Sequence, residues 1–393
     1  MADKAQGGAV VTVGIVAGEA SGDALAATLI HAVRARCPNV RFVGIAGPRM
    51  EAAGCEAWFP LEKLAVRGFV EVVAHLPELL RIRRELRARL LRANVPLFVG
   101  VDAPDFNLGL EKKLKRRGVR TVHFVSPSVW AWRRERLRTI GDSVNRMLVL
   151  FPFEPPLYRD AGIPVTYVGH PMARHAADHA SRRETRDLLR IRPSAPVFAL
   201  LPGSRMSEIE MHAGLVLETA AWLHEARADA QFLVPFATRA TRDAFEETMH
   251  RMGHANLPIT LLYGHADDAL RAADVGLVAS GTATLEAALA RCPHVIFYRV
   301  SRLTAWMVAR KLLLPYVGLP NVIAGRFVVP EFLQTQATPR NLAQAALNLF
   351  DDTVTRRRLE ALFAGFANEL RTDTAALAGE AVAQELAEAG HAC

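Results

Sequence analysis

Short apolar runs without polar alternation recur along almost the whole chain. Such runs are typical of parallel strands that are covered by helices on both faces. In the first half they predict strands at residues 10–16, 41–45, 97–101, 121–125, 147–151 and 165–168. In the second half they predict strands at 197–201, 231–235, 259–262, 275–278 and 295–298. Apolar residues at helical spacing separate them, for example over 23–35, 77–91, 211–226 and 285–290.

This strand–helix alternation predicts an α/β fold of two tandem, doubly wound, Rossmann-like domains. A chain of 393 residues is long enough for each domain to bury its own core. The junction is predicted after Gly169-His170-Pro171, where the polar segment 174–186 interrupts the alternation. We therefore expect a first domain over residues 1–172, completed by C-terminal helices within 355–393, and a second over 173–354.

Composition narrows the class of protein. A hydrophobic content of 51% with 22% charged residues is not that of a disordered chain. No run approaches the ~18 apolar residues of a membrane-spanning helix, and the acidic start Met1-Ala2-Asp3-Lys4 does not predict a signal peptide. The four cysteines are scattered without a CxxC pair, which predicts reduced thiols in a cytosolic protein, with neither zinc nor a disulfide framework: Cys37, Cys55, Cys292 and Cys393.

Two matched turns in the second half carry the first candidate chemistry. The turn Gly203-Ser204-Arg205 follows the apolar run 197–201, and Ser280-Gly281-Thr282 follows the run 275–278. Open α/β sheets bind ligands at the carboxyl ends of their strands, where small residues let backbone N–H groups approach a phosphate. Arg205 adds a guanidinium suited to phosphate oxygens, and Glu286 could accept hydrogen bonds from ribose hydroxyls. Each turn alone has an ordinary strand-to-helix interpretation, but the pair favours a nucleotide diphosphate site.

In the first half, Asp102 and Asp105 follow the apolar run 97–101. Asp102 at the tip of a central strand, facing the cleft where the two domains should meet, is a candidate general base. The alternative for either aspartate is a helix N-cap, which is a common position for this residue type. The opening turn 17–23 lacks the GxGxxG spacing of dinucleotide binders, although Gly18 and Ser21 still suggest a loop that a ligand approaches closely.

These segments resemble the signature blocks of the lipid A disaccharide synthase family, and they occur in the family's order over about residues 10–335. The matching blocks are 18–23, 47–50, 102–107, 126–132 (Ser-Pro-Ser-Val-Trp-Ala-Trp, the most specific), 169–171, 201–205, 279–282 and 319–321. The resemblance implies a two-domain GT-B fold with its domains facing a cleft, and an inverting hexosyltransferase that needs no metal or other cofactor. It implies transfer from UDP-2,3-diacylglucosamine to 2,3-diacylglucosamine 1-phosphate, giving the β-1,6 lipid A disaccharide 1-phosphate and UDP.

The resemblance also assigns roles to residues. Asp102 matches the family's proposed base, and Arg205 matches its phosphate-binding arginine. We expect the remaining substrate- and nucleotide-binding residues to be Gly18, Ser21, Gly203, Ser204, Ser280, Gly281, Thr282, Glu286 and Asn321. A metal site is not expected, since Asp267-Asp268 lacks the spacer of an Asp-x-Asp motif.

Acylated sugars require a route to a membrane. The segment 64–82 is rich in apolar residues and leads into the arginine cluster 83–89, which together favour an interface with anionic lipid. The predicted membrane patch consists of Val66, Phe69, Val70, Val73 and Leu76. The alternative is a core-facing amphipathic helix with a solvated basic face, and the same choice applies to residues 306–314. We expect a cytoplasmic enzyme, peripheral on the inner membrane and in contact with its lipids, and a homodimer is left open.

Two rival functions remain at this stage. Another GT-B enzyme, such as a UDP-sugar epimerase or a transferase acting on soluble sugars, would share the Gly-Ser-Arg turn but would not depend on detergent. The net charge of +8 would also suit a nucleic-acid-binding protein. The basic residues are interspersed with acidic ones and form no aromatic–basic recognition motif, so we expect no nucleic-acid partner.

Overall fold

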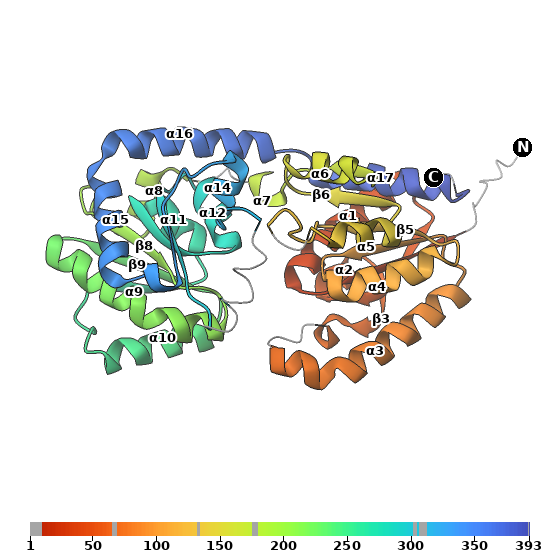
Figure 1. Cartoon of the computed structure of the whole chain (residues 1–393), viewed down its shortest axis with the longest axis horizontal. Helices are drawn as coiled ribbons and strands as arrows, with labels where there is room; N and C mark the ends of the chain where they lie inside the picture. The colour runs from red at the N-terminus through yellow and green to blue at the C-terminus, as the bar shows by residue number, and fades with distance from the viewer. Residues whose placement is uncertain are drawn as a thin grey trace, which may run out of the picture. The chain divides into compact units, whose positions relative to one another are not determined.

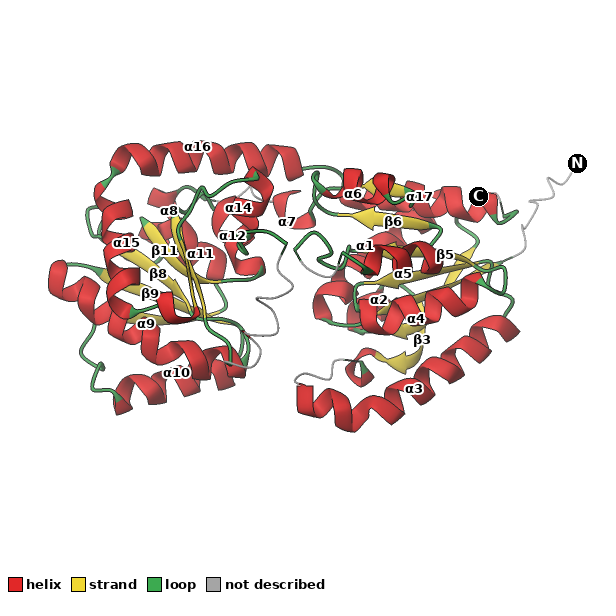
Figure 2. Ribbon diagram, viewed as in Figure 1, coloured by secondary structure: helices red, strands yellow, loops and turns green. Residues whose placement is uncertain are grey.

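The computed structural model describes residues 10–64, 69–131, 134–174, 180–301, 305, 313–391 and 393, leaving aside the side chains of 69–74. The chain forms two compact units. The first comprises Met1–Pro171 and Thr372–Cys393, and the second comprises Met172–Arg371. Each unit has its own parallel sheet with helices on both faces, as Figures 1 and 2 show.

The sheet of the first unit has the strand order β3-β2-β1-β4-β5-β6-β7. Its strands are β1 Val11–Ala17, β2 Val40–Ala46, β3 Cys55–Pro60, β4 Leu97–Val101, β5 Arg120–Phe124, β6 Arg146–Val149 and β7 Val165–Tyr167. Its helices are α1 Ala20–Arg36, α2 Pro48–Ala52, α3 Phe69–Arg92, α4 Pro104–Lys115, α5 Arg136–Ser143, α6 Glu154–Asp160 and α17 Thr374–Glu388, with a short 3-10 turn at Leu61–Lys63.

The sheet of the second unit has the order β10-β9-β8-β11-β12-β13. Its strands are β8 Val197–Leu201, β9 Gln231–Phe236, β10 Ile259–Tyr263, β11 Val275–Ala279, β12 His294–Tyr298 and β13 Glu331–Leu333. Its helices are α7 Pro171–Arg174, α8 Arg182–Leu188, α9 Met206–Ala226, α10 Arg239–Arg251, α11 Ala266–Ala272, α12 Thr282–Leu289, α14 Leu319–Ala324, α15 Pro339–Asp351 and α16 Thr353–Leu370, with a 3-10 turn at Gln334–Gln336. Strand order reverses between β8 and β11, which is where such sheets bind ligands.

The two faces of each sheet explain why the strands read as continuous apolar runs. In the first unit, alternate residues of β1 and β4 point into two different cores: Ile15 and Val99 pack with α1 and α17, whereas Val16 and Phe98 pack with α3 and α4. Residues on both faces are therefore withdrawn from water. The predicted doubly wound α/β architecture is confirmed.

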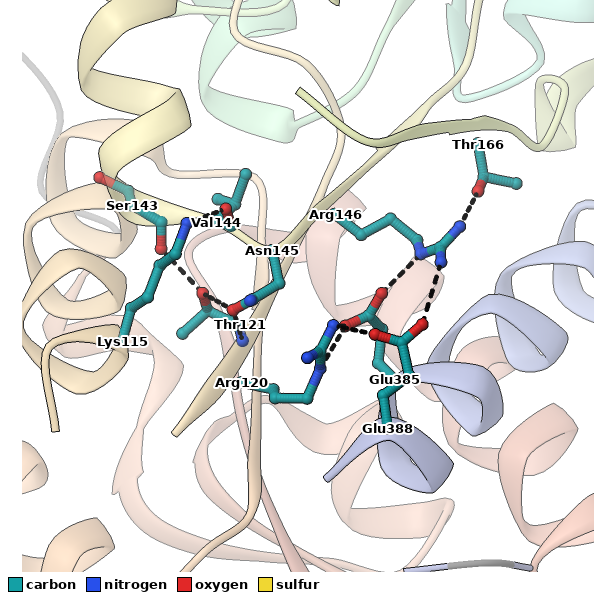
Figure 3. Close-up of polar contacts among 10 residues, drawn as sticks. All are labelled: Lys115, Arg120, Thr121, Ser143, Val144, Asn145, Arg146, Thr166, Glu385 and Glu388. Carbon is teal, nitrogen blue, oxygen red and sulfur yellow. Dashed lines mark hydrogen bonds and ion pairs between the residues drawn. The ribbon is translucent and has the colours of Figure 1, made fainter. Parts of the chain in front are cut away.

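Helix α17 returns from the end of the chain to cover the first sheet. It packs along α1, and Ala378, Ala381 and Val382 join the core there. Figure 3 shows its polar anchor, in which Arg120 Nε and Arg146 Nε each donate to the buried Glu385 carboxylate at 2.7 Å.

Three sequence predictions need correction. Helix α16 packs into the core of the second unit through Leu359 and Phe363, so residues 355–371 do not complete the first unit. Helix α3 begins at Phe69 and accommodates Pro77 inside it, instead of beginning there. The strands β3 and β13 were not predicted, because Glu56 interrupts the apolar pattern of the partly exposed β3 and β13 has only three residues.

The cysteine prediction is wrong for one pair. Cys37 and Cys393 form a disulfide although 356 residues separate them in the sequence. Their approach follows from the packing of α17 on α1, which no local spacing of cysteines could indicate. Cys55 and Cys292 are free and buried, and burial raises the pKa of each thiol to about 12.

Candidate active site

Asp102 follows β4 directly and lies in a tight turn before α4. Asp102 and Ala103 both have positive φ, at 54° and 43°. Ala103 is the residue that caps α4, so the N-cap interpretation of Asp102 does not hold. Among the described residues, no hydrogen bond or ion pair engages the Asp102 carboxylate, which is partly exposed and available to a ligand.

Asp105 has a different environment. It lies in the first turn of α4, and its Oδ1 accepts from Arg136 Nη2 at 2.6 Å. The Asp105 carboxylate therefore already has a cationic partner, whereas the Asp102 carboxylate has none among the described residues. Of the two aspartates, Asp102 is therefore the better placed to take a proton from a substrate.

The Gly18–Asp23 segment has a structural task beside the Asp102 turn. A Cβ on Gly18 would lie 2.2 Å from the Cβ of Ala103, so only glycine lets these two loops pack. Asp23 is buried, and its carboxylate accepts from the backbone N–H groups of Gly47, Arg49 and Met50 at 3.0–3.1 Å. Asp23 thus fixes the start of α2, whereas Ser21 is exposed and free to meet a ligand.

The loop after β5 begins with a strained residue. Val125 has a φ of 81°, which is an outlier for a β-branched side chain and marks a conformation fixed by its surroundings. Ser126 Oγ lies 2.6 Å from Tyr158 Oη, and Trp130 packs edge-on against Phe153 with ring centroids 5.4 Å apart. Trp132, the last residue of the matching block 126–132, lies outside the described residues.

Glu154 hydrogen-bonds to Ser126 in the loop after β5, and the sequence did not predict this role. Its Oε2 accepts from the N–H groups of Leu150 and Phe151 at 3.1 and 2.9 Å, and it also bonds to Ser126. Burial raises the pKa of Glu154 to about 7, against the lowering effect of these hydrogen bonds. The Glu-Pro-Pro start of α6 indicates a helix N-terminus but not a buried carboxylate.

The two nominated turns of the second unit leave neighbouring strands. Strands β8 and β11 pair in register, with Val278 opposite Leu201, so the loops that follow them meet at one edge of the sheet. Gly203 has a φ of 128° and Gly281 a φ of 150°, both of which favour glycine. Ser280 and Thr282 lie at the start of α12, and Ser204 lies at the start of α9.

Arg205 is more than half exposed and already has a partner. Its Nη1 lies 3.2 Å from Glu208 Oε1, while Glu208 Oε2 accepts from the N–H groups of Ser204 and Arg205 at 2.8 and 3.2 Å. The Glu208 carboxylate therefore accepts from the guanidinium and backbone N–H groups that the sequence predicts to bind phosphate. Glu208 was not predicted as a site residue, although its place three residues after the N-cap Arg205 is a capping-box position.

His212 ties this loop to its neighbour. It is fully buried on α9, its Nδ1 contacts Pro202 O at 2.7 Å, and its Nε2 accepts from Arg299 N at 3.0 Å. With Nδ1 as the donor, the ring holds the loops after β8 and β12 together. A lone histidine in an Ala/Leu-rich helix gives no sequence signal of this bridge.

Glu286 lies on α12 beside the Ser280–Thr282 turn. Burial raises its pKa, and the nearby Asp267 raises it further. Among the residues that the structure describes, no side chain or backbone group hydrogen-bonds to its carboxylate. A desolvated acceptor at this edge is suited to a ligand hydroxyl.

Asn321 has a structural task. Its Nδ2 donates to Val329 O and Glu331 Oε1 at 3.0 and 2.7 Å, and its Oδ1 accepts from the N–H groups of Val328 and Val329. The side-chain amide is therefore buried and fully hydrogen-bonded within the described residues, and a nucleotide contact of Asn321 stays a prediction. Asn321 fixes the turn after α14.

The predicted membrane segment is described only in part. Val66 lies outside the described residues, as do the side chains of Phe69, Val70 and Val73 and the second stretch 306–312. Leu76 is 47% exposed on α3. Further along, α3 and α4 form a small hollow lined by Leu80 and four basic residues, Arg83, Arg84, Arg87 and Lys113. Burial and the neighbouring arginines lower the pKa of Lys113.

Within the described ranges, no helix combines the length and the apolar character needed to cross a bilayer. In the same ranges, no three His, Cys, Asp or Glu side chains are grouped so that they could hold a metal ion.

Comparison with solved structures defines the class. The chain superimposes on the UDP-GlcNAc 2-epimerase of Methanocaldococcus jannaschii, solved with UDP-GlcNAc and UDP, with a TM-score of 0.60 and 12% identity, covering 96% of this chain and 100% of that one. It superimposes on a glycosyltransferase from Rickettsia africae with a TM-score of 0.58 and 11% identity, covering 97% and 98%. The architecture is that of the GT-B glycosyltransferases.

Sequence comparison then gives the family. The family model for lipid-A-disaccharide synthetase matches residues 13–384. The lipid-A-disaccharide synthase of Chromobacterium violaceum is 55% identical over 370 residues, which cover 94% of this chain and 96% of that one. The chain belongs to the lipid-A-disaccharide synthase family, and it is a glycosyltransferase of lipid A biosynthesis that forms the lipid A disaccharide.

Proposed function

We propose that this enzyme transfers 2,3-diacylglucosamine from UDP to the 6-hydroxyl of 2,3-diacylglucosamine 1-phosphate with inversion at the anomeric carbon. The family supplies the disaccharide product and the general kinds of substrate. The observation that carries the mechanism is the position of Asp102, whose unengaged carboxylate follows the central strand β4.

In this proposal, Asp102 takes the proton of the acceptor 6-hydroxyl as its oxygen attacks the anomeric carbon. The new C–O bond forms on the face opposite the departing UDP, and the electron pair of the broken glycosyl–phosphate bond stays on the β-phosphate oxygen. The proton remains on Asp102 until solvent removes it. A single displacement by one base gives the inverted β-linkage.

Residues of the second unit stabilise the negative charge that develops on the departing UDP. Arg205 and the backbone N–H groups of Ser204 and Arg205 contact the diphosphate, with Gly203, Ser280, Gly281 and Thr282 allowing its close approach. Binding exchanges the Glu208 contacts of these donors for phosphate oxygens. Glu286 accepts from the ribose hydroxyls, which supply the hydrogen bonds its carboxylate lacks. Because the guanidinium and the N–H groups counter the charge, the proposal requires no metal cofactor.

Acylated substrates bring the enzyme to a membrane surface. Helix α3 presents Leu76 and, beyond it, the basic hollow between α3 and α4. Basic residues beside apolar ones favour an anionic bilayer surface. We infer peripheral association with the inner membrane on its cytoplasmic side, through α3 and the segment before it.

The test is incubation with UDP-diacylglucosamine and the 1-phosphate monosaccharide in detergent, with mass detection of disaccharide and UDP and assignment of the new linkage by NMR. Asp102→Asn should lower kcat at least ~10²-fold while keeping UDP affinity, because only the proton acceptor is lost. EDTA should leave the rate unchanged. An α-linkage, or near-normal turnover by Asp102→Asn, would refute the mechanism, and Asp105→Asn would then be measured.

A further inference from the structure

Three polar side chains lie beneath the Asp102 turn and take no part in the proposed chemistry. Asn107 and Glu111 project from α4 one helical turn apart, and His123 projects from β5. All three have 0% exposure. Fully buried charged residues are rare unless they are paired, and each costs stability, so their presence beside a candidate base needs an explanation.

The turn they support is strained. Asp102 and Ala103 are consecutive residues other than glycine in the left-handed conformation, which L-residues adopt reluctantly. Such conformations persist only where the surrounding structure determines them, and they concentrate at functional sites. The conformation of this turn sets where the Asp102 side chain points.

Asn107 is the direct tether of the turn. Its Nδ2 donates to Asp102 O at 2.8 Å, and the Asp102 N–H donates to Phe124 O, also at 2.8 Å. Both backbone polar groups of Asp102 are thus held, one by α4 and the other by β5. The carboxylate itself stays outside these contacts.

Glu111 and His123 form the layer below the tether. Glu111 Oε1 lies 2.8 Å from His123 Nδ1. A Cβ on Gly100, two residues before Asp102, would lie 2.1 Å from Glu111 Oε1 and 3.0 Å from Asn107 Cβ. The missing side chain of Gly100 therefore makes room for both α4 residues against the end of β4.

We propose that Asn107, Glu111 and His123 form a buried positioning network that holds the Asp102 turn in the orientation needed for proton transfer. The inference rests on the proposed role of Asp102 as the base. Within the described residues, one polar atom of each member is buried without a partner: Asn107 Oδ1, Glu111 Oε2 and His123 Nε2. Asn107 and the Glu111–His123 pair are therefore joined by their packing against Gly100. Burial raises the pKa of Glu111, against the lowering effect of its contact with His123.

The first test separates positioning from stability. Asn107→Ala removes the tether and should lower kcat at least ~10-fold, with KM for both substrates and UDP affinity within about twofold. Leu110→Ala, at a fully buried apolar position of the same helix, is the matched control. It should lower Tm at least as much and leave kcat within about twofold. If Asn107→Ala lowers Tm but keeps kcat, the network is only structural and the inference fails.

Two substitutions of Glu111 test the Glu111–His123 contact separately from Asn107. Glu111→Gln keeps an acceptor for His123 Nδ1 and should retain kcat within about fivefold. Glu111→Leu has a similar volume but no acceptor, and it should lose at least ~10-fold in kcat in its folded fraction. Equal kcat values for these two variants would overturn the network.

A double mutant shows whether Asn107 affects kcat through Asp102. If Asn107 acts through Asp102, Asn107→Ala/Asp102→Asn should turn over no more than about threefold slower than Asp102→Asn alone. Multiplied losses would mean that Asn107 acts independently, which contradicts the inference. Near-normal kcat in Asp102→Asn would remove the base assignment and this inference together, whereas near-normal kcat in Asn107→Ala alone would remove only the inference.

Discussion

At the scale of single residues, Arg205 presents the sharpest question, because its guanidinium is paired with Glu208. Arg205→Ala should weaken UDP binding by about 1.5–3 kcal/mol, the range for a hydrogen bond to a charged group. Isothermal titration calorimetry with UDP measures this loss. The control is Arg251→Ala. Arg251 is exposed in the last turn of α10, which leads to the amino end of β10, whereas Arg205 follows the carboxyl end of β8.

Unchanged UDP affinity in Arg205→Ala would exclude the residue from the diphosphate site. Glu286→Ala should cost less, and its effect should disappear with a UDP analogue that lacks both ribose hydroxyls. A loss that persists with this analogue would mean that Glu286 acts elsewhere.

Glu154 predicts a pH dependence of stability. Burial raises its folded-state pKa from 4.5 to about 7. The folded state then binds the proton more tightly than the unfolded state, so stability is greatest below pH 4.5 and declines as the pH rises to about 7. At about 1.4 kcal/mol per pKa unit, the decline has an upper limit of ~3 kcal/mol.

Glu154→Gln should flatten this decline in urea unfolding curves measured between pH 4.5 and 8. Asp160→Asn, an exposed position at the end of the same helix, should leave it unchanged. An identical slope in wild-type protein and Glu154→Gln would show that Glu154 does not titrate in this range.

Sequence reasoning located site residues only where a local pattern exists. Asp102 and Arg205 follow apolar strands, so their positions at strand ends could be predicted. The buried residues near them are Glu111, His123 and His212, which lie on helices and a strand without any motif, whereas Glu208 occupies a capping-box position that could have been recognised. Burial and contacts across the sheet determine their environments, as they do for the hydrogen-bonded amide of Asn321.

At the scale of elements, α3 carries the membrane prediction. Positions 69, 73, 76, 80, 83 and 87 recur on one face of a helix, whereas Ile82, Leu86 and Leu90 pack into the core. Phe69→Ser/Val73→Ser should abolish sedimentation with anionic vesicles and preserve UDP binding. Wild-type protein should sediment at low salt and detach as salt rises, since each basic residue contributes about 1 kcal/mol and is screened.

Leu188→Ser, at an exposed apolar position of the second unit, is the control and should sediment like wild type. If the α3 double variant unfolds, its residues belong to the core and the amphipathic-helix alternative is correct. The transferase assignment would not be affected.

Elements were predicted best where burial is uniform. The eleven predicted strands are all present. Two-sided burial imposes an apolar run on the central ones, whereas the edge strands β7 and β10 are mostly apolar in sequence although they are only partly buried. The edge strands β3 and β13 escaped detection because a glutamate interrupts the apolar pattern of the first and the second has only three residues, one of them Glu331. Helix α3 escaped in part because a proline is normally a boundary, whereas here the helix continues through Pro77.

At the scale of the whole molecule, the first unit depends on the end of the chain. Glu385 is 1% exposed and holds Arg120 and Arg146. Glu385→Ala should destabilise the first unit by about 2–4 kcal/mol, because removing one partner leaves the other charges unpaired. The estimate is reduced because both arginines retain some contact with water.

Differential scanning calorimetry should show this loss as a shift of one transition, with the transition of the second unit unchanged. Glu380→Ala, on the exposed side of α17, is the matched control. Equal shifts of both transitions would mean that the two units do not unfold separately.

The path of the chain reverses the order in which the two units can mature on a ribosome. Residues 172–371 form a continuous unit that can fold as soon as they have emerged. The unit that is synthesised first must wait about two hundred residues for α17, with the apolar side chains of α1 that face it uncovered until then. Of the two units, the first is therefore begun earlier and completed later, which makes its nascent form the part with the longest exposure of apolar surface.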